Sequence, residues 1–398
     1  MKATPSKSIA VNIQSEVQLF SIEPLLDSLR TMFSDVKIVL DSFASNQDGY
    51  EKMAEGVVKT IKKHGLTPEF SQNLTNQKFD VYLTPYTDDY IKADCYLKYE
   101  YGTLNIKPIL TYIPTKLERF HGFLCQSTIT SSLLSCYGKT FPVDNLRFYN
   151  KKPIKHNSTK KCLLFAPTFN SDDSFKDIKT ILQSLKSKYH IIIKSHHGTQ
   201  YLNSNQKIRH LLKEYADEYY EADTSLSDLI LKSDVCLFGN SSAIAEALYA
   251  KIPCAIFAHD LNFFKYGSLN TTQYAFVKSG YIPFTNQPKK IDEIIKQALN
   301  PDIIKKQAKL SKKIFPATYH TGLKGYLNAI EYFLYSEEAK DYIIFHDEIF
   351  KSRQAILDVE KRNFENAKKI LENYESGKLY KVATKLYQLE GRIRHVKS

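Results

Sequence analysis

The segment SDVCLFGNSSAIAEALYAKIPCAIF, residues Ser233–Phe257, decides the fold. It reads as a short apolar strand, a turn of small polar residues, a helix and a second apolar strand. This succession is the βαβ unit of a parallel sheet. The turn Gly239-Asn240-Ser241-Ser242 leads into the helix. Unpaired backbone N–H groups and the helix dipole favour a bound anion there, although a serine at this place also serves as an ordinary N-cap.

The same alternation of strand and helix runs through both halves of the chain. Apolar, β-branched runs predict strands at Ser8–Ile13, Val36–Ser42, Phe79–Pro85, Lys107–Ile113 and Phe120–Cys125 in the first half, and at Cys162–Phe169, His190–Gly198 and Ile252–Ala258 in the second. Between the first two strands, Val17–Phe33 has the apolar spacing of a helix. The polar, basic stretch Phe141–Lys161 has no periodicity and reads as a linker.

We therefore expect an α/β protein of GT-B architecture, with two Rossmann-like, doubly wound domains facing a ligand cleft and a helical C-terminal extension. The expected parts are an N-terminal acceptor domain at residues 1–145, a nucleotide-donor domain at 146–320 and a basic helical extension at 321–398.

Composition narrows the class of partner. The 398 residues are 43% hydrophobic and 25% charged, with a net charge of +12, which favours an anionic partner. We expect no nucleic-acid partner, because no recognition motif accompanies the lysines. The N-terminal residues resemble no export signal, and no apolar run approaches the roughly 20 residues of a membrane span. We expect a cytoplasmic protein, peripheral at the inner face of the membrane.

The last residues, Lys378–Ser398, carry six basic groups and one acid, with leucines interleaved. This pattern suits a basic amphipathic helix on an anionic membrane surface, and equally a helix that packs one face on the body of the protein.

Polar side chains follow the predicted strands of the second half at their carboxyl ends, which meet at one edge of a parallel sheet. The candidate donor-binding residues there are Thr168, Lys194, Ser195, Asn240, Ser241, Ser242 and Glu246. The serines would hold a pyrophosphate and Glu246 ribose hydroxyls. Lys194, or a histidine at His196 or His197, would neutralise charge on the departing nucleotide.

Metal and cofactor motifs are missing from the sequence. It contains no DxD pair, no HExxH, no CxxC pair, no Walker-type loop and no GxGxxG. We therefore expect no metal and no cofactor, with the nucleotide-activated donor acting as a substrate.

The residues from Cys162 to Ala258 resemble the CDP-glycerol glycerophosphotransferase family, the teichoic-acid primases and polymerases. The likeness rests on Ala166-Pro167-Thr168-Phe169, Ser233-Asp234-Val235, the Ser241-Ser242 pair, Glu246 and Pro253. Asn170 stands where the family tends to have arginine. The resemblance implies a metal-independent transferase that moves a phosphopolyol from a CDP-type donor.

The family's N-terminal half carries an HGTPLK element whose histidine is thought to be the catalytic base. The nearest match here begins with Tyr101-Gly102-Thr103, so tyrosine replaces histidine. A tyrosine with a pKa near 10 is a poor base at neutral pH. Two alternatives stay open: Tyr101 assisted by Glu100 or Asp94, and His121, which lies 20 residues further on.

Two enzyme classes follow from these patterns. The first is a transferase that moves a phosphopolyol or sugar from a nucleotide-activated donor to an anionic cell-surface glycan, such as a teichoic acid or capsule polysaccharide, or to a lipid-linked acceptor. The second is a relative of the nucleotide-sugar 2-epimerases, or another GT-B glycosyltransferase of capsule or lipopolysaccharide synthesis. An epimerase needs carboxylates beside the sugar, and the sequence shows no acidic cluster at the first domain's edge.

Overall fold

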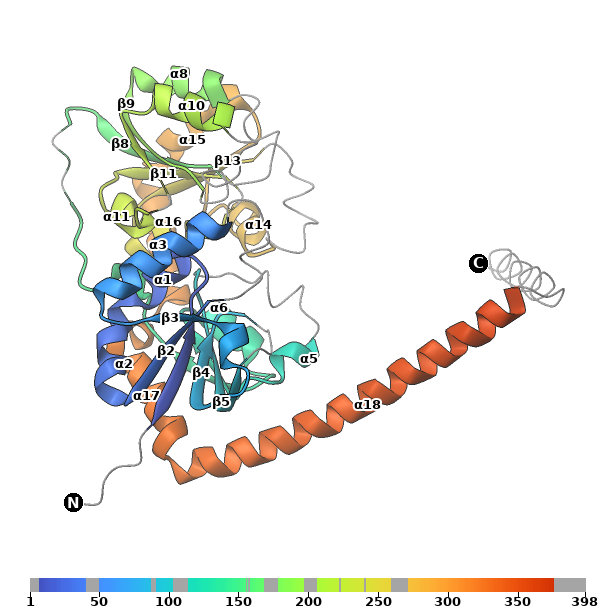
Figure 1. Ribbon diagram of the computed structural model, residues 1–398. Coiled ribbons are helices and arrows are strands. Elements are labelled where there is room, and N and C mark those ends of the chain that lie inside the picture. The colour runs from blue at the N-terminus through green and yellow to red at the C-terminus, as the bar shows by residue number, and fades with distance from the viewer. Residues whose placement is uncertain are drawn as a thin grey trace. The chain divides into compact units, whose positions relative to one another are not determined.

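The computed structural model describes residues 7–40, 50–86, 91–102, 114–154, 156, 158–167, 178–196, 206–221, 223–239, 241–258 and 271–375. By its internal contacts the chain divides into one unit that ends at Lys340 and a second that starts at Asp341. The first unit contains two parallel sheets with their helices (Figure 1). The second unit contains most of the long helix α18 (Glu337–Glu375).

The first sheet is a parallel sheet of seven strands in the order β3-β2-β1-β4-β5-β6-β7. The strands are β1 (Ser8–Asn12), β2 (Asp35–Leu40), β3 (Pro68–Phe70), β4 (Lys78–Thr84), β5 (Lys92–Tyr99), β6 (Gly122–Cys125) and β7 (Lys139–Pro142). The helices of this part are α1 (Glu16–Ile22), α2 (Leu26–Met32), α3 (Tyr50–Lys63), α5 (Pro114–Leu117) and α6 (Thr128–Leu134). The strand order reverses between β1 and β4, as in doubly wound folds.

The second sheet repeats this plan with six parallel strands in the order β10-β9-β8-β11-β12-β13. The strands are β8 (Lys161–Ala166), β9 (Tyr189–Lys194), β10 (Glu218–Tyr220), β11 (Val235–Phe238), β12 (Cys254–Phe257) and β13 (Phe284–Thr285). The helices are α8 (Ile178–Lys186), α10 (Gln206–Tyr215), α11 (Leu226–Leu231), α12 (Ala243–Ala250), α14 (Thr271–Lys278), α15 (Ile291–Ala298) and α16 (Pro301–Ile314).

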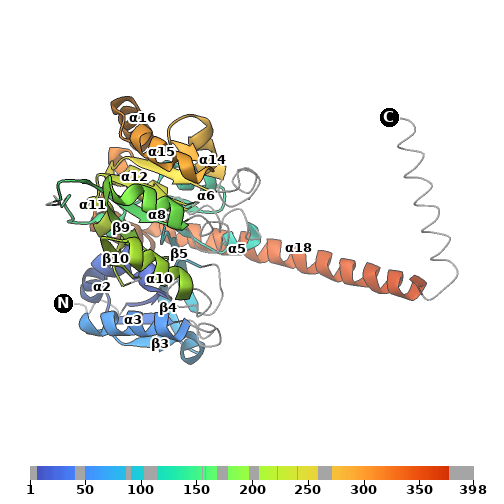
Figure 2. The ribbon, with the colours of Figure 1, turned by 90° about the horizontal axis from the view of Figure 1, so that it is seen from above.

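Successive residues of the second sheet's strands point to opposite faces, and both faces are covered. Leu163 and Phe165 of β8 pack under α8, α10 and α15, which lie on the same side of the sheet (Figure 2). Cys162 and Leu164 pack under α11, α12 and α16. Burial on both faces explains why these strands are continuously apolar, and the expected doubly wound α/β fold is confirmed.

Two features of the structure differ from the sequence pattern. The expected helix at residues 17–33 is two helices, α1 and α2, separated by the 3-10 helix Glu23–Leu25. Pro24 causes this break, because it lacks the N–H that a continuous helix requires. The pattern also missed β3, β5, β7, β10 and β13, of which all but β5 have only two to four residues. The expected strand at residues 107–113 lies outside the described residues.

The C-terminal helices return from the second sheet to the first. α16 buries Leu310 and Ile314 against the second sheet, whereas α17 (Leu323–Tyr335) packs on the first. A Cβ atom added at Gly122 of β6 would lie 2.7 Å from the Phe333 ring of α17. This close approach requires glycine at residue 122. Within the described parts of the chain, no helix is long and apolar enough to cross a membrane.

Candidate functional site

A cavity of about 350 Å³ lies between the two sheets of the first unit, and elements of both halves line it. The second half contributes the ends of β8 and β9 and the start of α12, and the first half contributes α1 and the turn after β5. The β8/β11 pair is where the second sheet's strand order reverses. This is the place where open α/β sheets bind ligands. The lining residues are Val17, Phe20, Tyr101, Gly102, Arg147, Ala166, Pro167, Lys194, Ser195, His196, Thr224, Ser225, Leu226, Ser241, Ser242, Ala243 and Glu246.

The first turn of α12 presents two serine side chains to this cavity. Ser241 Oγ accepts a hydrogen bond from the backbone N–H of Ala243 at 3.2 Å, so this serine caps the helix. Ser242 occupies the N-cap position, yet its side chain makes no capping hydrogen bond. The hydroxyl of Ser242 is therefore not used for capping, and it stands at the positive end of the helix dipole.

Glu246 lies one turn further along α12 and is only 2% exposed. Its Oε1 accepts a hydrogen bond from Arg147 Nη1 at 2.5 Å. Its Oε2 is buried without a hydrogen-bond partner among the described residues. Burial raises the pKa of Glu246, and the Arg147 guanidinium opposes that rise. An unsatisfied buried carboxylate oxygen is costly, so a ligand hydroxyl that donated to Oε2 would remove that cost.

Arg147 joins the two halves of the cavity. It lies in the 3-10 helix Leu146–Phe148, between the two sheets in sequence, and its side chain is 6% exposed. It donates to Ser21 Oγ at 2.8 Å and to the carbonyl oxygens of Val17, at 2.6 Å, and Tyr101. One guanidinium therefore binds α1, the turn after β5 and Glu246 of α12 together. No sequence pattern predicts this role, because the residue stands in an aperiodic linker.

The end of β9 supplies a cation and a buried hydroxyl. Lys194 Nζ donates to the carbonyl oxygen of Glu221 at 2.7 Å. Burial lowers the pKa of Lys194 to about 8, so the ammonium form still predominates at neutral pH. Ser195 is 1% exposed, and its Oγ lies 2.8 Å from the hydroxyl of Tyr219. His196 also lines the cavity. An anion between β9 and α12 would meet positive charge from both sides.

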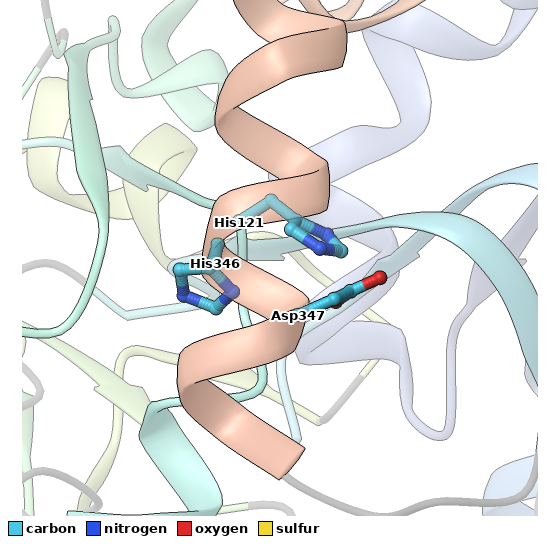
Figure 3. Close-up of side chains that lie close together, drawn as sticks. All are labelled: His121, His346 and Asp347. Atoms are coloured by element: carbon cyan, nitrogen blue, oxygen red, sulfur yellow. The ribbon is translucent and has the colours of Figure 1, made fainter. Parts of the chain in front are cut away.

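The first half brings Tyr101 to the cavity but not His121. The Tyr101 ring lies 6.2 Å from that of Tyr86 between ring centres, tilted by 42°, and the Tyr101 carbonyl oxygen accepts from Ser21 Oγ at 3.0 Å. His121, labelled in Figure 3, directly precedes β6 and is completely buried. Its Nδ1 accepts the backbone N–H of Tyr96 at 3.0 Å. His121 does not line the cavity, so the structure gives no support for it as the base.

The two carboxylates considered as helpers of Tyr101 differ in position. Asp94 lies near the start of β5 and pairs with Lys78 of β4. Tyr101 follows the other end of this strand, roughly 20 Å away at about 3.3 Å per residue, so Asp94 cannot assist it. Glu100 accepts the backbone N–H of Gln126 at 2.9 Å through Oε2, and burial raises its pKa to about 7. However, Glu100 is not among the lining residues of the cavity.

The cavity therefore gathers seven of the predicted site residues, namely Tyr101, Lys194, Ser195, His196, Ser241, Ser242 and Glu246. Thr168, His197 and Asn240 lie outside the described residues, as does the basic segment 378–398. The structure adds Arg147 and an apolar wall from Val17 and Phe20. The apolar spacing of residues 17–33 predicts a helix that contains Val17 and Phe20. It does not indicate that these two side chains face a ligand.

One cluster away from the cavity has the residue types of a metal site. Ligand atoms of His156, His190 and Glu218 lie within 4.8 Å of one another. However, His156 Nδ1 accepts the backbone N–H of Ser158 at 2.9 Å, which leaves the proton of a neutral ring on Nε2. Nε2 lies 2.9 Å from Glu218 Oε1, and Lys232 donates to the other oxygen of this carboxylate. Hydrogen bonds within the protein therefore already occupy His156 and Glu218. A metal-bound histidine normally donates a hydrogen bond through its second ring nitrogen, whereas Nδ1 of His156 accepts one.

Comparisons with known proteins show the fold. No family model and no curated protein matches the chain. A proposed UDP-N-acetylglucosamine 2-epimerase from Listeria monocytogenes aligns with a TM-score of 0.55 and 11% identity, over 83% of this chain and 97% of that one. MnaA of S. aureus in complex with UDP gives 0.54 and 13%, over 82% and 97%. The wall teichoic acid polymerase TagF soaked with CDPG gives 0.53 and 11%, over 88% and 90%. The chain therefore has a GT-B fold.

Proposed function

We propose that the protein is a GT-B transferase that binds a nucleotide-activated donor in the cavity and transfers its phosphopolyol or sugar group. The observation that carries the proposal is the unpartnered Oε2 of Glu246, buried one turn beyond Ser242. A carboxylate that lacks a donor, beside the positive end of a helix, suits a ribose diol next to a diphosphate. The proposal names a CDP- or CMP-type donor because of the family resemblance carried by Pro167, Ser241, Ser242 and Glu246.

The lining residues fit the successive parts of such a donor. The diphosphate would lie between the α12 N-terminus and Lys194, where backbone N–H groups, the Ser242 hydroxyl and an ammonium group meet negative charge. The ribose hydroxyls would donate to Glu246 Oε2. The apolar side chains of Val17 and Phe20 would face the remaining, less polar part of the ligand.

The reaction itself needs a leaving group that is stabilised and an acceptor hydroxyl that loses its proton. When the bond to the transferred group breaks, the nucleotide gains negative charge, and Lys194 with His196 would stabilise it. The acceptor's proton needs a base on the first half's side of the cavity. Among the described lining residues on that side, Tyr101 is the titratable group that would take this role.

The identity of the acceptor and the attachment of the protein to the inner face of the membrane are also proposals. We propose an anionic cell-surface glycan or a lipid-linked primer as the acceptor, in keeping with the net charge of +12. MnaA has been solved with UDP and TagF with CDPG, so related folds bind the kind of ligand proposed here.

A 2-epimerase activity is the second candidate, since a proposed UDP-N-acetylglucosamine 2-epimerase shares the fold. Proton abstraction from a sugar carbon needs an unpaired base beside the sugar. Glu246 is the only carboxylate among the described lining residues, and it is paired with Arg147. This arrangement favours transfer over epimerisation.

A nucleotide panel tests the proposal. The purified protein is heated with CDP-glycerol, CDP-ribitol, CMP-sugars and UDP-sugars, and the rise in melting temperature ranks the donors. We expect Ser242→Ala to reduce the rise, and Ser132→Ala, on the exposed face of α6, to leave it unchanged. The proposal fails if no nucleotide raises the melting temperature. Release of free nucleotide on adding acceptor then identifies transfer, whereas interconversion of two UDP-sugars identifies an epimerase.

A further inference from the structure

The long helix α18 exposes an unusual amount of apolar surface. Its 39 residues span about 58 Å at about 1.5 Å per residue. Ile349 is 39% exposed, Ile356 59% and Phe364 72%. A stable soluble helix normally covers such side chains, so this face requires an occupant.

The apolar residues of α18 repeat every seven positions. One row consists of Ile343, Phe350, Leu357, Phe364 and Leu371. The row immediately before it consists of Tyr342, Ile349, Ile356 and Ile370, and is interrupted by the polar Asn363. A seven-residue repeat over five cycles keeps one stripe facing a partner only if that partner is another helix that supercoils with it. The periodicity therefore indicates a helical occupant.

Between the two rows runs a third row that contains charges. It consists of His346, Arg353, Glu360, Ala367 and Tyr374, and Figure 3 shows His346 beside Asp347 on the helix. Arg353 and Glu360 lie equally far from the midpoint between Ile356 and Leu357. Two copies of α18 that run antiparallel about a two-fold axis at this midpoint would bring Arg353 of each opposite Glu360 of the other. A single contact thus forms twice, as two-fold symmetry requires.

The same axis matches the apolar rows with each other. Positions equally distant from the midpoint include Ile349 with Phe364. The sequence of α18 is thus self-complementary in the antiparallel direction.

The charge of α18 argues against a membrane as the occupant. The helix carries ten acidic and seven basic residues, so an anionic lipid surface would repel it. We propose that α18 pairs antiparallel with α18 of a second copy of the chain, with reciprocal Arg353–Glu360 ion pairs on either side of Ile356 and Leu357. This inference does not depend on the proposed function.

A charge swap on the full chain tests the pairing. We expect the protein to sediment as a dimer, and Arg353→Glu or Glu360→Arg alone to raise the dimer dissociation constant at least tenfold, because like charges then meet in the seam. The double variant, which restores opposite charges, should return to within threefold of the original. Arg362→Glu, on the opposite side of the helix from the seam, is the control. A monomer at 100 µM, or a double variant as weak as the single ones, overturns the proposal.

Disulfide trapping tests the direction. In a Cys136→Ser background, which removes the one exposed cysteine of the described chain, Ile356→Cys should form a disulfide between copies under mild oxidation. Phe364→Cys alone should not, whereas Phe364→Cys mixed with Ile349→Cys should. Efficient self-linkage of Phe364→Cys would show a parallel pair and overturn the antiparallel arrangement. Flotation of the protein with phosphatidylserine vesicles, without dimerisation, would overturn the choice of occupant.

Discussion

Replacing Glu246 by glutamine should weaken nucleotide binding through one identifiable contact. The substitution keeps the shape of the side chain and leaves an amide oxygen to accept from Arg147 Nη1, now 2.5 Å from Oε1. It replaces the unpartnered Oε2 by an N–H group, which cannot accept a hydrogen bond from ribose.

The magnitude follows from the type of bond that is lost. A hydrogen bond to a charged group contributes about 1.5–3 kcal/mol. Its loss should raise the dissociation constant of a nucleoside diphosphate about 10- to 150-fold. Calorimetric titration of the best-ranked nucleotide measures this, with Glu331→Gln, an exposed carboxylate of α17, as the matched control.

A dideoxy ligand assigns the effect to the ribose. A 2′,3′-dideoxy nucleoside diphosphate lacks both hydroxyls, so the original protein should bind it as weakly as Glu246→Gln binds the ribonucleotide. Combining variant and dideoxy ligand should then cost little more, because both changes remove the same interaction. Additive losses would refute the contact between Glu246 and ribose. A variant that binds the ribonucleotide normally would refute it too.

Three further outcomes follow from the structure. Arg147→Ala leaves Glu246 buried and unpaired, so denaturant titration should show a loss of about 3–5 kcal/mol of unfolding free energy; a loss under about 1 kcal/mol would mean that the pair is not buried. Because burial lowers the pKa of Lys194 to about 8, its positive charge, and with it diphosphate affinity, should decline between pH 7 and pH 9. Lys194→Arg should remove this decline, since arginine stays protonated, and a persistent decline would point to another group. Gly122→Ala places a methyl group 2.7 Å from Phe333 and 2.9 Å from Leu97, so urea titration should show a loss of about 1–3 kcal/mol, and unchanged stability would contradict the tight packing of α17 on β6.

The donor half of the cavity followed from the sequence because its residues depend on local rules. A parallel strand buried on both faces is continuously apolar, and its carboxyl end marks the ligand edge. Lys194, Ser242 and Glu246 could be placed at one edge from these rules alone. The structure confirms this placement, because all three residues line the same cavity.

The acceptor half could not be predicted in this way. Whether His121 or Tyr101 faces the cavity depends on the register of β5 and β6, and β5 itself was missed. Its sequence, KADCYLKY, mixes charged and aromatic residues and has no clear period. Asp94 appeared near Tyr101 in sequence, but an extended strand separates them by most of its length.

Arg147 shows a different limit of sequence reasoning. The four hydrogen-bond partners of its side chain lie 46 to 130 residues away in the chain. A side chain whose role is to join two halves leaves no periodic trace near its own position. Only the packing of the linker between the sheets reveals it.

The most direct test of the account is a crystal structure of the protein with the best-ranked nucleoside diphosphate. The account predicts that the diphosphate lies at the start of α12, within hydrogen-bonding distance of Ser242 and near Lys194, and that a ribose hydroxyl donates to Glu246 Oε2. A nucleotide bound outside this cavity, or bound in it with the ribose away from Glu246, would contradict the account.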